Sequence, residues 1–245
     1  MARAPEHIVK SFDEALNDMR ALVTRMGGLA EAQIAAGVKA LAQRDEDLAR
    51  KVIAGDAAID TLEDEIDDAA VRLIALRQPM AIDLREVIAA LKISSDIERI
   101  ADYAANVAKR SIALNQTPPV PSASAIPRLA RLVQNILKDT LDAYAERDAE
   151  RAIDVWHRDE EVDEMYTGLF RELLTYMMED VRNITPCTHL LFIAKNIERM
   201  GDHATNIAEN IHFLVTGKRL EGGRPKGDTT SFQVVAPPED DGTQS

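Results

Sequence analysis

Two sets of polar residues with the same types and the same spacing stand one hundred residues apart in this chain. The first set is Glu98, Asp102 and Asn106, and the second is Glu198, Asp202 and Asn206, each within the pattern Glu-Arg-x-x-Asp-x-Ala-x-Asn-x-Ala. Residues four positions apart lie on one face of a helix. Carboxylate and amide oxygens that share a face are ligands for hard metal ions, so the pattern indicates metal binding rather than packing alone.

A second pair of acids accompanies each set. Asp56 and Asp60 precede the first set, and Asp159 and Asp163 precede the second. The offset between the copies is 103 residues at these pairs and 100 residues at the later sets, so we expect a turn between two helices to differ in length. A period of this size is too long for a solenoid repeat and indicates two copies of one domain.

The positions of the acids predict that they meet across neighbouring helices. Asp60 and Glu98 are equally distant from residue 79, where a turn is expected. Asp56 and Asp102 have the same midpoint, so a tight turn places both pairs at matching heights on antiparallel helices. The equivalent pairs in the second copy, centred between residues 180 and 181, are Asp163 with Glu198 and Asp159 with Asp202.

The helical wheel predicts that these acids face outward or along a rim. Glu98, Asp102 and Asn106 average roughly 170° from the apolar stripe of their helix, and Asp56 and Asp60 lie roughly 120° from theirs. A buried unpaired carboxylate would cost several kcal/mol. We therefore expect solvent-facing acidic clusters that collect cations.

Long apolar stripes at helical spacing predict an all-α fold for the 245 residues. Helices are expected over residues 8–44, 46–77, 83–114, 127–146, 149–178 and 186–216. Short connections make neighbouring helices antiparallel. The predicted architecture is two tandem antiparallel three-helix bundles, related by internal duplication, with six long helices.

A connector rich in proline and serine predicts the domain boundary. The expected division is a first bundle at 6–114, a linker at 115–126, a second bundle at 127–216 and a tail at 217–245. The tail is rich in glycine, proline and acids and has no apolar period, so we expect it to be disordered.

The composition excludes several classes of protein. A net charge of −13 and an aromatic content of 4% argue against a nucleic-acid partner. One cysteine, Cys187, supports neither a disulfide framework nor a CxxC metal site. Because no secretory signal and no long apolar run are visible, we expect a cytoplasmic protein.

Two other interpretations of the acidic motifs remain open. One is a di-iron carboxylate enzyme on a helical bundle, because Glu209 and His212 have the Glu-x-x-His spacing of such sites. The first copy has Lys109 and Ile112 at the matching positions, so one motif stands where that chemistry needs two. The other is a metal-free helical scaffold whose acids form a solvated face. No nucleophile elbow or glycine-rich phosphate loop is visible, so we expect no enzyme.

The doubled acidic-x-x-x-Asp motif within a duplicated three-helix unit resembles the PhoU family over residues 6–216. Members of that family are cytoplasmic regulators of phosphate uptake and phosphate signalling. The resemblance implies multinuclear metal clusters at these motifs. The predicted metal ligands are Asp56, Asp60, Glu98, Asp102, Asp159, Asp163, Glu198 and Asp202, with Asn106 and Asn206 as further oxygen donors.

An all-oxygen ligand set suits Mg²⁺, Mn²⁺, Ca²⁺ or iron and argues against a thiolate zinc site. The ions expected are divalent or trivalent, with iron, manganese, magnesium and zinc as the candidates. The resemblance further implies a homodimer that binds the ATPase subunit of a phosphate ABC transporter and a sensor histidine kinase. Such a protein would restrain the phosphate-starvation response and would meet the membrane only through these partners.

Overall fold

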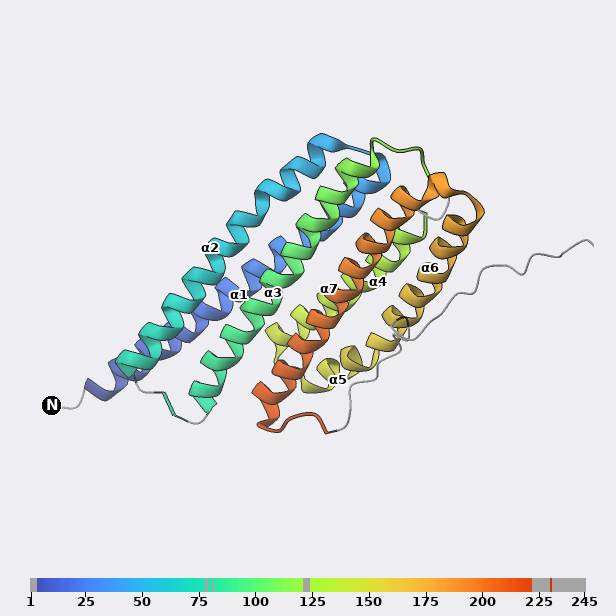
Figure 1. Ribbon diagram of the computed structural model, residues 1–245. Helices are drawn as coiled ribbons and strands as arrows, with labels where there is room; N and C mark the ends of the chain where they lie inside the picture. Colours follow the sequence, from blue (N-terminus) through green and yellow to red (C-terminus); the bar gives the residue numbers. More distant parts are fainter. Residues whose placement is uncertain (1–3, 78, 81, 121–123, 222–229, 231–245) are drawn as a thin grey trace, which may run out of the picture.

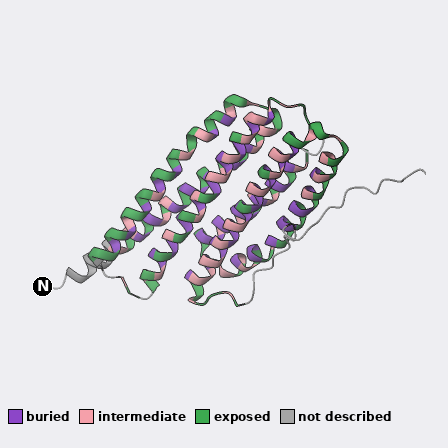
Figure 2. Ribbon diagram, viewed as in Figure 1, coloured by how far each residue is buried: buried purple, intermediate pink, exposed green. Residues whose placement is uncertain are grey.

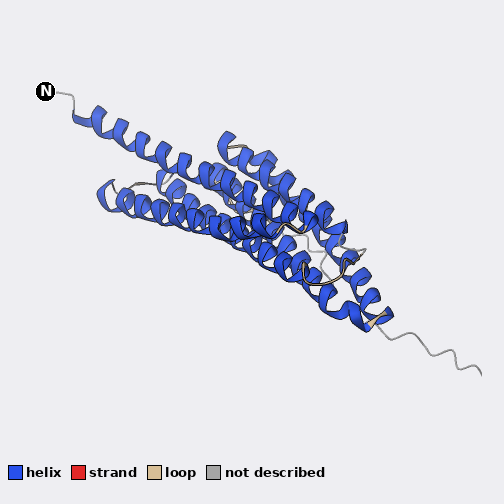
Figure 3. Ribbon diagram, turned by 90° about the horizontal axis from the view of Figure 1, so that it is seen from above, coloured by secondary structure: helices blue, strands red, loops and turns tan. Residues whose placement is uncertain are grey.

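Every regular element in the described part of the protein is a helix, with no strand among these residues (Figure 3). The computed structural model describes residues 4–77, 79–80, 82–120, 124–221 and 230, with side chains from residue 12 onward except at residue 77. The elements are α1 (Ala4–Gln43), α2 (Glu46–Arg77), α3 (Ile82–Leu114), α4 (Ile126–Glu146), α5 (Ala149–His157), α6 (Asp159–Glu179), the short 3₁₀ helix η2 (Val181–Asn183) and α7 (Ile184–Thr216). The predicted all-α, duplicated fold is confirmed.

The second copy differs from the first in its middle helix. The helix α2 is continuous, whereas α5 and α6 together occupy the expected helix at 149–178. At the break, the Arg158 amide donates to the Val155 carbonyl at 3.0 Å, and the Arg158 carbonyl accepts from the Glu161 amide at 3.2 Å. These three-residue spacings form a tighter turn than an α-helix and bend the chain just before Asp159.

The turn after the first helix of each copy shows the duplication at the level of the backbone. Arg44 follows α1 with φ 55°, and Arg147 follows α4 with φ 54°, both in the left-handed region. The next residue then caps the following helix. Asp45 Oδ1 accepts from the Leu48 amide at 2.9 Å, and Asp148 Oδ1 accepts from two amides of α5 at 3.0 Å.

The two motif-bearing helices, α3 and α7, lie side by side and antiparallel in the middle of the molecule (Figure 1). The helix α3 packs against α1 and α2, and α7 packs against α4, α5 and α6. Met26, Ile97, Val133 and Ile197 belong to one cluster of buried apolar side chains that runs through both halves. Figure 2 shows these buried faces turned towards one another. The bundles therefore share one core.

An ion cluster also links the two bundles. Glu86 on α3 is 3% exposed and accepts hydrogen bonds from Arg20 on α1 and from Arg147 after α4. Burial alone would raise the pKa of Glu86, but the hydrogen bonds from the two arginines outweigh it and lower that pKa below its ordinary value. Removal of Glu86 would leave two guanidinium groups without this partner.

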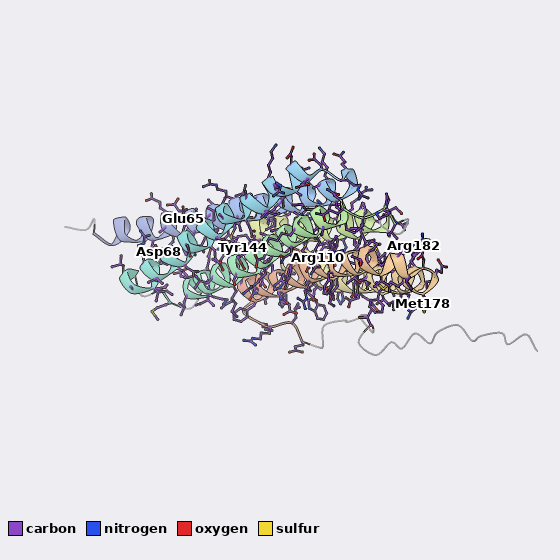
Figure 4. The ribbon with its side chains drawn as sticks, turned by 45° about the horizontal axis from the view of Figure 1, so that its top comes forward. Glu65, Asp68, Arg110, Tyr144, Met178 and Arg182 are labelled. Atoms are coloured by element: carbon purple, nitrogen blue, oxygen red, sulfur yellow. The ribbon has the colours of Figure 1, made fainter. Side chains whose placement is uncertain are left out.

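The α2–α3 hairpin and the α6–α7 hairpin have their turns at opposite ends of the molecule. In Figure 4, Glu65 and Asp68 mark the α2 end of one hairpin, while Met178 and Arg182 mark the turn into α7 at the other. No helix in the described ranges is long and apolar enough to cross a membrane. The predicted linker is described except at 121–123, and most of the predicted tail lies outside the described residues.

Candidate functional site

The predicted acids of the first copy face one another across α2 and α3. Burial is the main cause that raises the pKa of Asp56, and repulsion from Asp102 and Asp60 raises it further. Burial likewise raises the pKa of Glu98, followed by repulsion from Asp102 and, more weakly, from Asp60. Repulsion of this kind requires short distances, so Asp56 lies near Asp102 and Glu98 near Asp60, as the counting about residue 79 predicts.

This first cluster lies along a rim, as the helical wheel predicts. Asp60 is exposed, and the side chains of Glu98 and Asp102 retain 19% and 41% exposure. Arg99 contributes positive charge at 3.5 Å from Glu98 and 3.9 Å from Asp102. Gln33 on α1 donates to Asp56 at 3.2 Å. Solvent and mobile surface cations can therefore reach most of this cluster.

Three of the four acids of the second copy are buried and the fourth, Asp202, is half-buried, so the prediction that the cluster faces outward is wrong there. Asp159, Asp163 and Glu198 are 2%, 3% and 4% exposed. The wheel treats each bundle as standing alone, whereas α7 is surrounded by α3, α4, α5 and α6. A Cβ atom at Gly201 would lie 3.3 Å from Val162 on α6, so the glycine lets the two helices approach closely.

Polar partners make this burial tolerable. Thr205 donates to Asp159 at 3.2 Å, and Lys195 Nζ donates to Glu198 Oε1 at 2.8 Å. The other oxygen of Glu198, Oε2, is buried and has no hydrogen-bond partner among the described residues. Burial raises the pKa of Glu198 to about 7; Lys195 opposes this shift, while Asp202 and Asp163 add to it. Asp163 and Glu198 therefore lie close together, as predicted.

The chemistry of these residues fits a cation, although their present arrangement does not form a ligand shell. Within the described ranges, no group of three or more His, Cys, Asp or Glu side chains is placed to hold a metal ion. The buried Oε2 of Glu198 and the mutual repulsion of the carboxylates are features that a bound cation would relieve. Side-chain rotation within the two clusters would be needed to converge the oxygens.

The two asparagines behave differently from the acids. Asn106 is half-buried on α3. Asn206 Nδ2 donates to Asp96 Oδ1 on α3 at 3.4 Å, so this amide links the two copies. Asp96 also accepts from His203 Nδ1 at 2.8 Å. The His203 ring lies 5.7 Å from that of Tyr103, its counterpart in the first copy.

Sequence reasoning missed this contact between α3 and α7 because it treated the bundles separately. The available signal was the replacement of Tyr103 by His203 at equivalent positions of the repeat.

The Glu-x-x-His pair has other partners. Glu209 Oε1 accepts from the indole nitrogen of Trp156 at 2.9 Å, and His212 Nδ1 lies 3.1 Å from the Lys218 carbonyl. Both side chains therefore serve the local packing of α5 and of the end of α7, which gives no support to the di-iron alternative.

Comparisons with known proteins agree with this architecture. The PhoU domain matches the chain twice, over residues 23–111 and 126–211. A relative from Caulobacter vibrioides, named phosphate-specific transport system accessory protein PhoU homolog, is 58% identical over 92% of this chain and 99% of its own. A relative of the same name from Xylella fastidiosa is 52% identical over 92% of this chain and 93% of its own.

Solved structures show the same fold. PhoU from Pseudomonas aeruginosa superposes with a TM-score of 0.82 at 40% identity, over 84% of this chain and all of that one. The phosphate transport system regulatory protein PhoU from Streptococcus pneumoniae gives a TM-score of 0.79 at 29% identity, over 86% and 99% of the two chains. With both repeats matched and whole-length relatives above half identity, the chain belongs to the PhoU family.

Proposed function

We propose that this chain regulates phosphate uptake and phosphate signalling as a cytoplasmic accessory protein of a phosphate transport system, and that it is not an enzyme. The observation that supports this most is the match of the PhoU domain to both repeats. The names of the relatives, which describe accessory proteins of a phosphate-specific transport system, point the same way.

The proposed partners are the ATPase subunit of a phosphate ABC transporter and a sensor histidine kinase, and the proposed acting form is a homodimer. Through these partners the chain would restrain the phosphate-starvation response when phosphate is plentiful. The shared core supports such a role, because both acidic clusters stand on helices that pack into it. A net charge of −13 favours cations or basic partner surfaces.

We also propose that the acidic motifs of both repeats bind metal ions. In the first repeat the ligands would come from Asp56, Asp60, Glu98 and Asp102. In the second they would come from Asp159, Asp163, Glu198 and Asp202. The unpartnered Oε2 of Glu198 and the repulsion within each cluster support this assignment. A bound cation would supply positive charge that offsets the carboxylates.

Two basic side chains now supply that charge. Arg99 lies beside Glu98 and Asp102 in the first repeat, and Lys195 contacts Glu198 in the second. Once their carboxylates are neutralised, both side chains lose electrostatic attraction to them. The side chain of Arg99 is 58% exposed, so its release would change the charge that a partner meets at the surface.

A pull-down from phosphate-replete and phosphate-starved cells tests the proposed regulation. Wild-type chain should capture a transporter ATPase and a sensor kinase, identified by mass. A variant with Asp60, Asp102, Asp163 and Asp202 changed to Ala should lose part of that capture if metal loading controls it.

The control changes Asp47, Asp64, Asp67 and Asp68, four exposed acids of α2 outside the motifs, to Ala, so that it removes the same number of charges. Capture of neither partner by the wild-type chain in either condition would contradict the regulator. Equal capture by both variants would contradict control by the acidic motifs.

A further inference from the structure

An open pocket of about 610 Å³ lies where α3 meets the C-terminal half of α7, with α5 and the segment after α7 as further walls. We call it the α3–α7 pocket. The residues that carry the argument are Lys92, Trp156, Asn210, Phe213 and Arg219. Its volume falls in the range of roughly 300–1,000 Å³ that small-molecule sites occupy. The pocket lies between the two copies of the duplicated unit, so both repeats are needed to form it.

The pocket is lined by two basic and two acidic side chains, in a chain whose net charge is −13. Lys92 and Arg219 are exposed, and neither forms an ion pair with another described residue. The two acids in the walls already have partners. Asp96 accepts from His203 and Asn206, and Glu209 accepts from the Trp156 indole.

Asn210 has a second amide hydrogen for an oxyanion, beside the one that it donates to the Asn206 carbonyl at 2.9 Å, whereas the Ser95 hydroxyl already bonds Glu63. The lining is formally neutral, but its two cations are exposed while its acids are half-buried and hydrogen-bonded, so an anion entering from solvent meets Lys92 and Arg219 first.

An aromatic wall stands beside this charge. The indole of Trp156 is held by its bond to Glu209 and is 7% exposed. The ring of Phe213 is half-buried, with the Arg85 guanidinium carbon 5.5 Å from its centroid. The partly exposed ring of Phe213 can stack on the flat ring of a ligand, whereas the indole of Trp156 offers only a small part of its surface. Inorganic phosphate would leave this wall and most of the volume unused.

We propose that the α3–α7 pocket binds a phosphorylated small molecule of the nucleotide class. Lys92 and Arg219 hold its phosphate groups, Asn210 donates to its oxygens, and Phe213, with the accessible part of Trp156, contacts its aromatic ring. The ligand touches both copies of the repeat, so its binding stabilises their packing against each other. This inference goes beyond phosphate regulation through partners and needs no metal, because the acidic motifs are not used.

Trp156 is the single tryptophan of the chain, so its fluorescence reports on this pocket directly. The full chain is titrated with ADP in the presence of EDTA, which removes any metal from the acidic motifs. We expect a saturable change in fluorescence, with binding heat of the same midpoint by calorimetry. Inorganic phosphate alone should bind at least about tenfold more weakly, because it lacks the ring contacts.

The matched variants each remove two exposed positive charges. Lys92→Gln with Arg219→Gln should raise the Kd for ADP at least about tenfold, because two charge-assisted contacts are lost. Lys39→Gln with Arg128→Gln, exposed on α1 and α4, should leave the Kd unchanged.

The proposal is overturned if the wild-type chain gives no saturable response to ADP. It is equally overturned if the Lys92 and Arg219 variant binds like wild type, or if phosphate binds as tightly as ADP. None of these results bears on the metal proposal, because EDTA is present throughout.

Discussion

The two acidic clusters descend from the same motif but meet different surroundings. In the first repeat a continuous α2 leaves Asp60 exposed and Asp102 partly exposed, with the surface residue Arg99 beside them. In the second repeat the chain breaks at Arg158, and Asp159, Asp163 and Glu198 are buried while Asp202 is half-buried, with Lys195 as the nearby cation. The same residue types can therefore form a surface cluster or a buried one, and the helix that packs over them decides which.

This difference in burial predicts that only the second acidic cluster makes the stability of the fold strongly dependent on pH. The pKa of Glu198 is about 7 in the folded protein, against 4.5 for an ordinary glutamate. The folded state therefore binds this proton more tightly than the unfolded state. Stability from this group is greatest below the unfolded pKa and falls as the pH rises towards the folded pKa.

Urea unfolding in EDTA across this pH range measures the effect. Relative to Glu198→Gln, the wild-type chain should lose up to about 3 kcal/mol in free energy of unfolding between pH values of about 4.5 and 8. The matched variant is Glu98→Gln, whose side chain keeps 19% exposure and should show a smaller change. If the difference in free energy of unfolding between wild type and Glu198→Gln does not change with pH, the carboxyl is not held in the buried state described above.

Removal of the basic residue beside each cluster should cost more stability in the second repeat than in the first. Lys195→Met removes the cation that contacts a buried carboxylate at 2.8 Å, so we expect a loss of about 2 kcal/mol at neutral pH. Arg99→Met removes a longer, more exposed contact and should cost less than about 1 kcal/mol. Chemical denaturation of both variants without metal makes the comparison, and equal costs would contradict the difference in environment.

A change at the close approach of α6 and α7 should have a smaller effect on stability. Gly201→Ala places a Cβ atom 3.3 Å from Val162 and 3.6 Å from Val133, so the Val162 side chain must move by a few tenths of an ångström. We expect a loss of about 1 kcal/mol from this crowding, offset in part by the better helix propensity of alanine. In the first repeat the same position is Ala101, which is buried. A clear gain in stability for Gly201→Ala would show that the glycine has no packing role.

The helices were predictable from sequence because their stripes are long and their ends are marked locally. The expected 46–77 coincides with α2, and the expected end at 216 coincides with that of α7. The pairing of Asp60 with Glu98 followed from simple counting about a tight turn.

The break at Arg158 was not predictable, because no proline or glycine lies between residues 149 and 167. The burial of Glu198 and the contact of Asp96 with His203 depend on how α3 meets α7, and single-helix periodicity does not encode that. The α3–α7 pocket escaped sequence reasoning for the same reason, since Lys92 and Asn210 meet only across the two repeats.

Metal content after equilibrium dialysis against Mn²⁺ tests most directly whether the duplicated carboxylates bind cations. We expect Asp60→Ala with Asp102→Ala to lose the ions of the first repeat, and Asp163→Ala with Asp202→Ala to lose those of the second. The surface variant Asp47→Ala with Asp64→Ala should retain the wild-type content. Unchanged manganese in both motif variants would contradict the account.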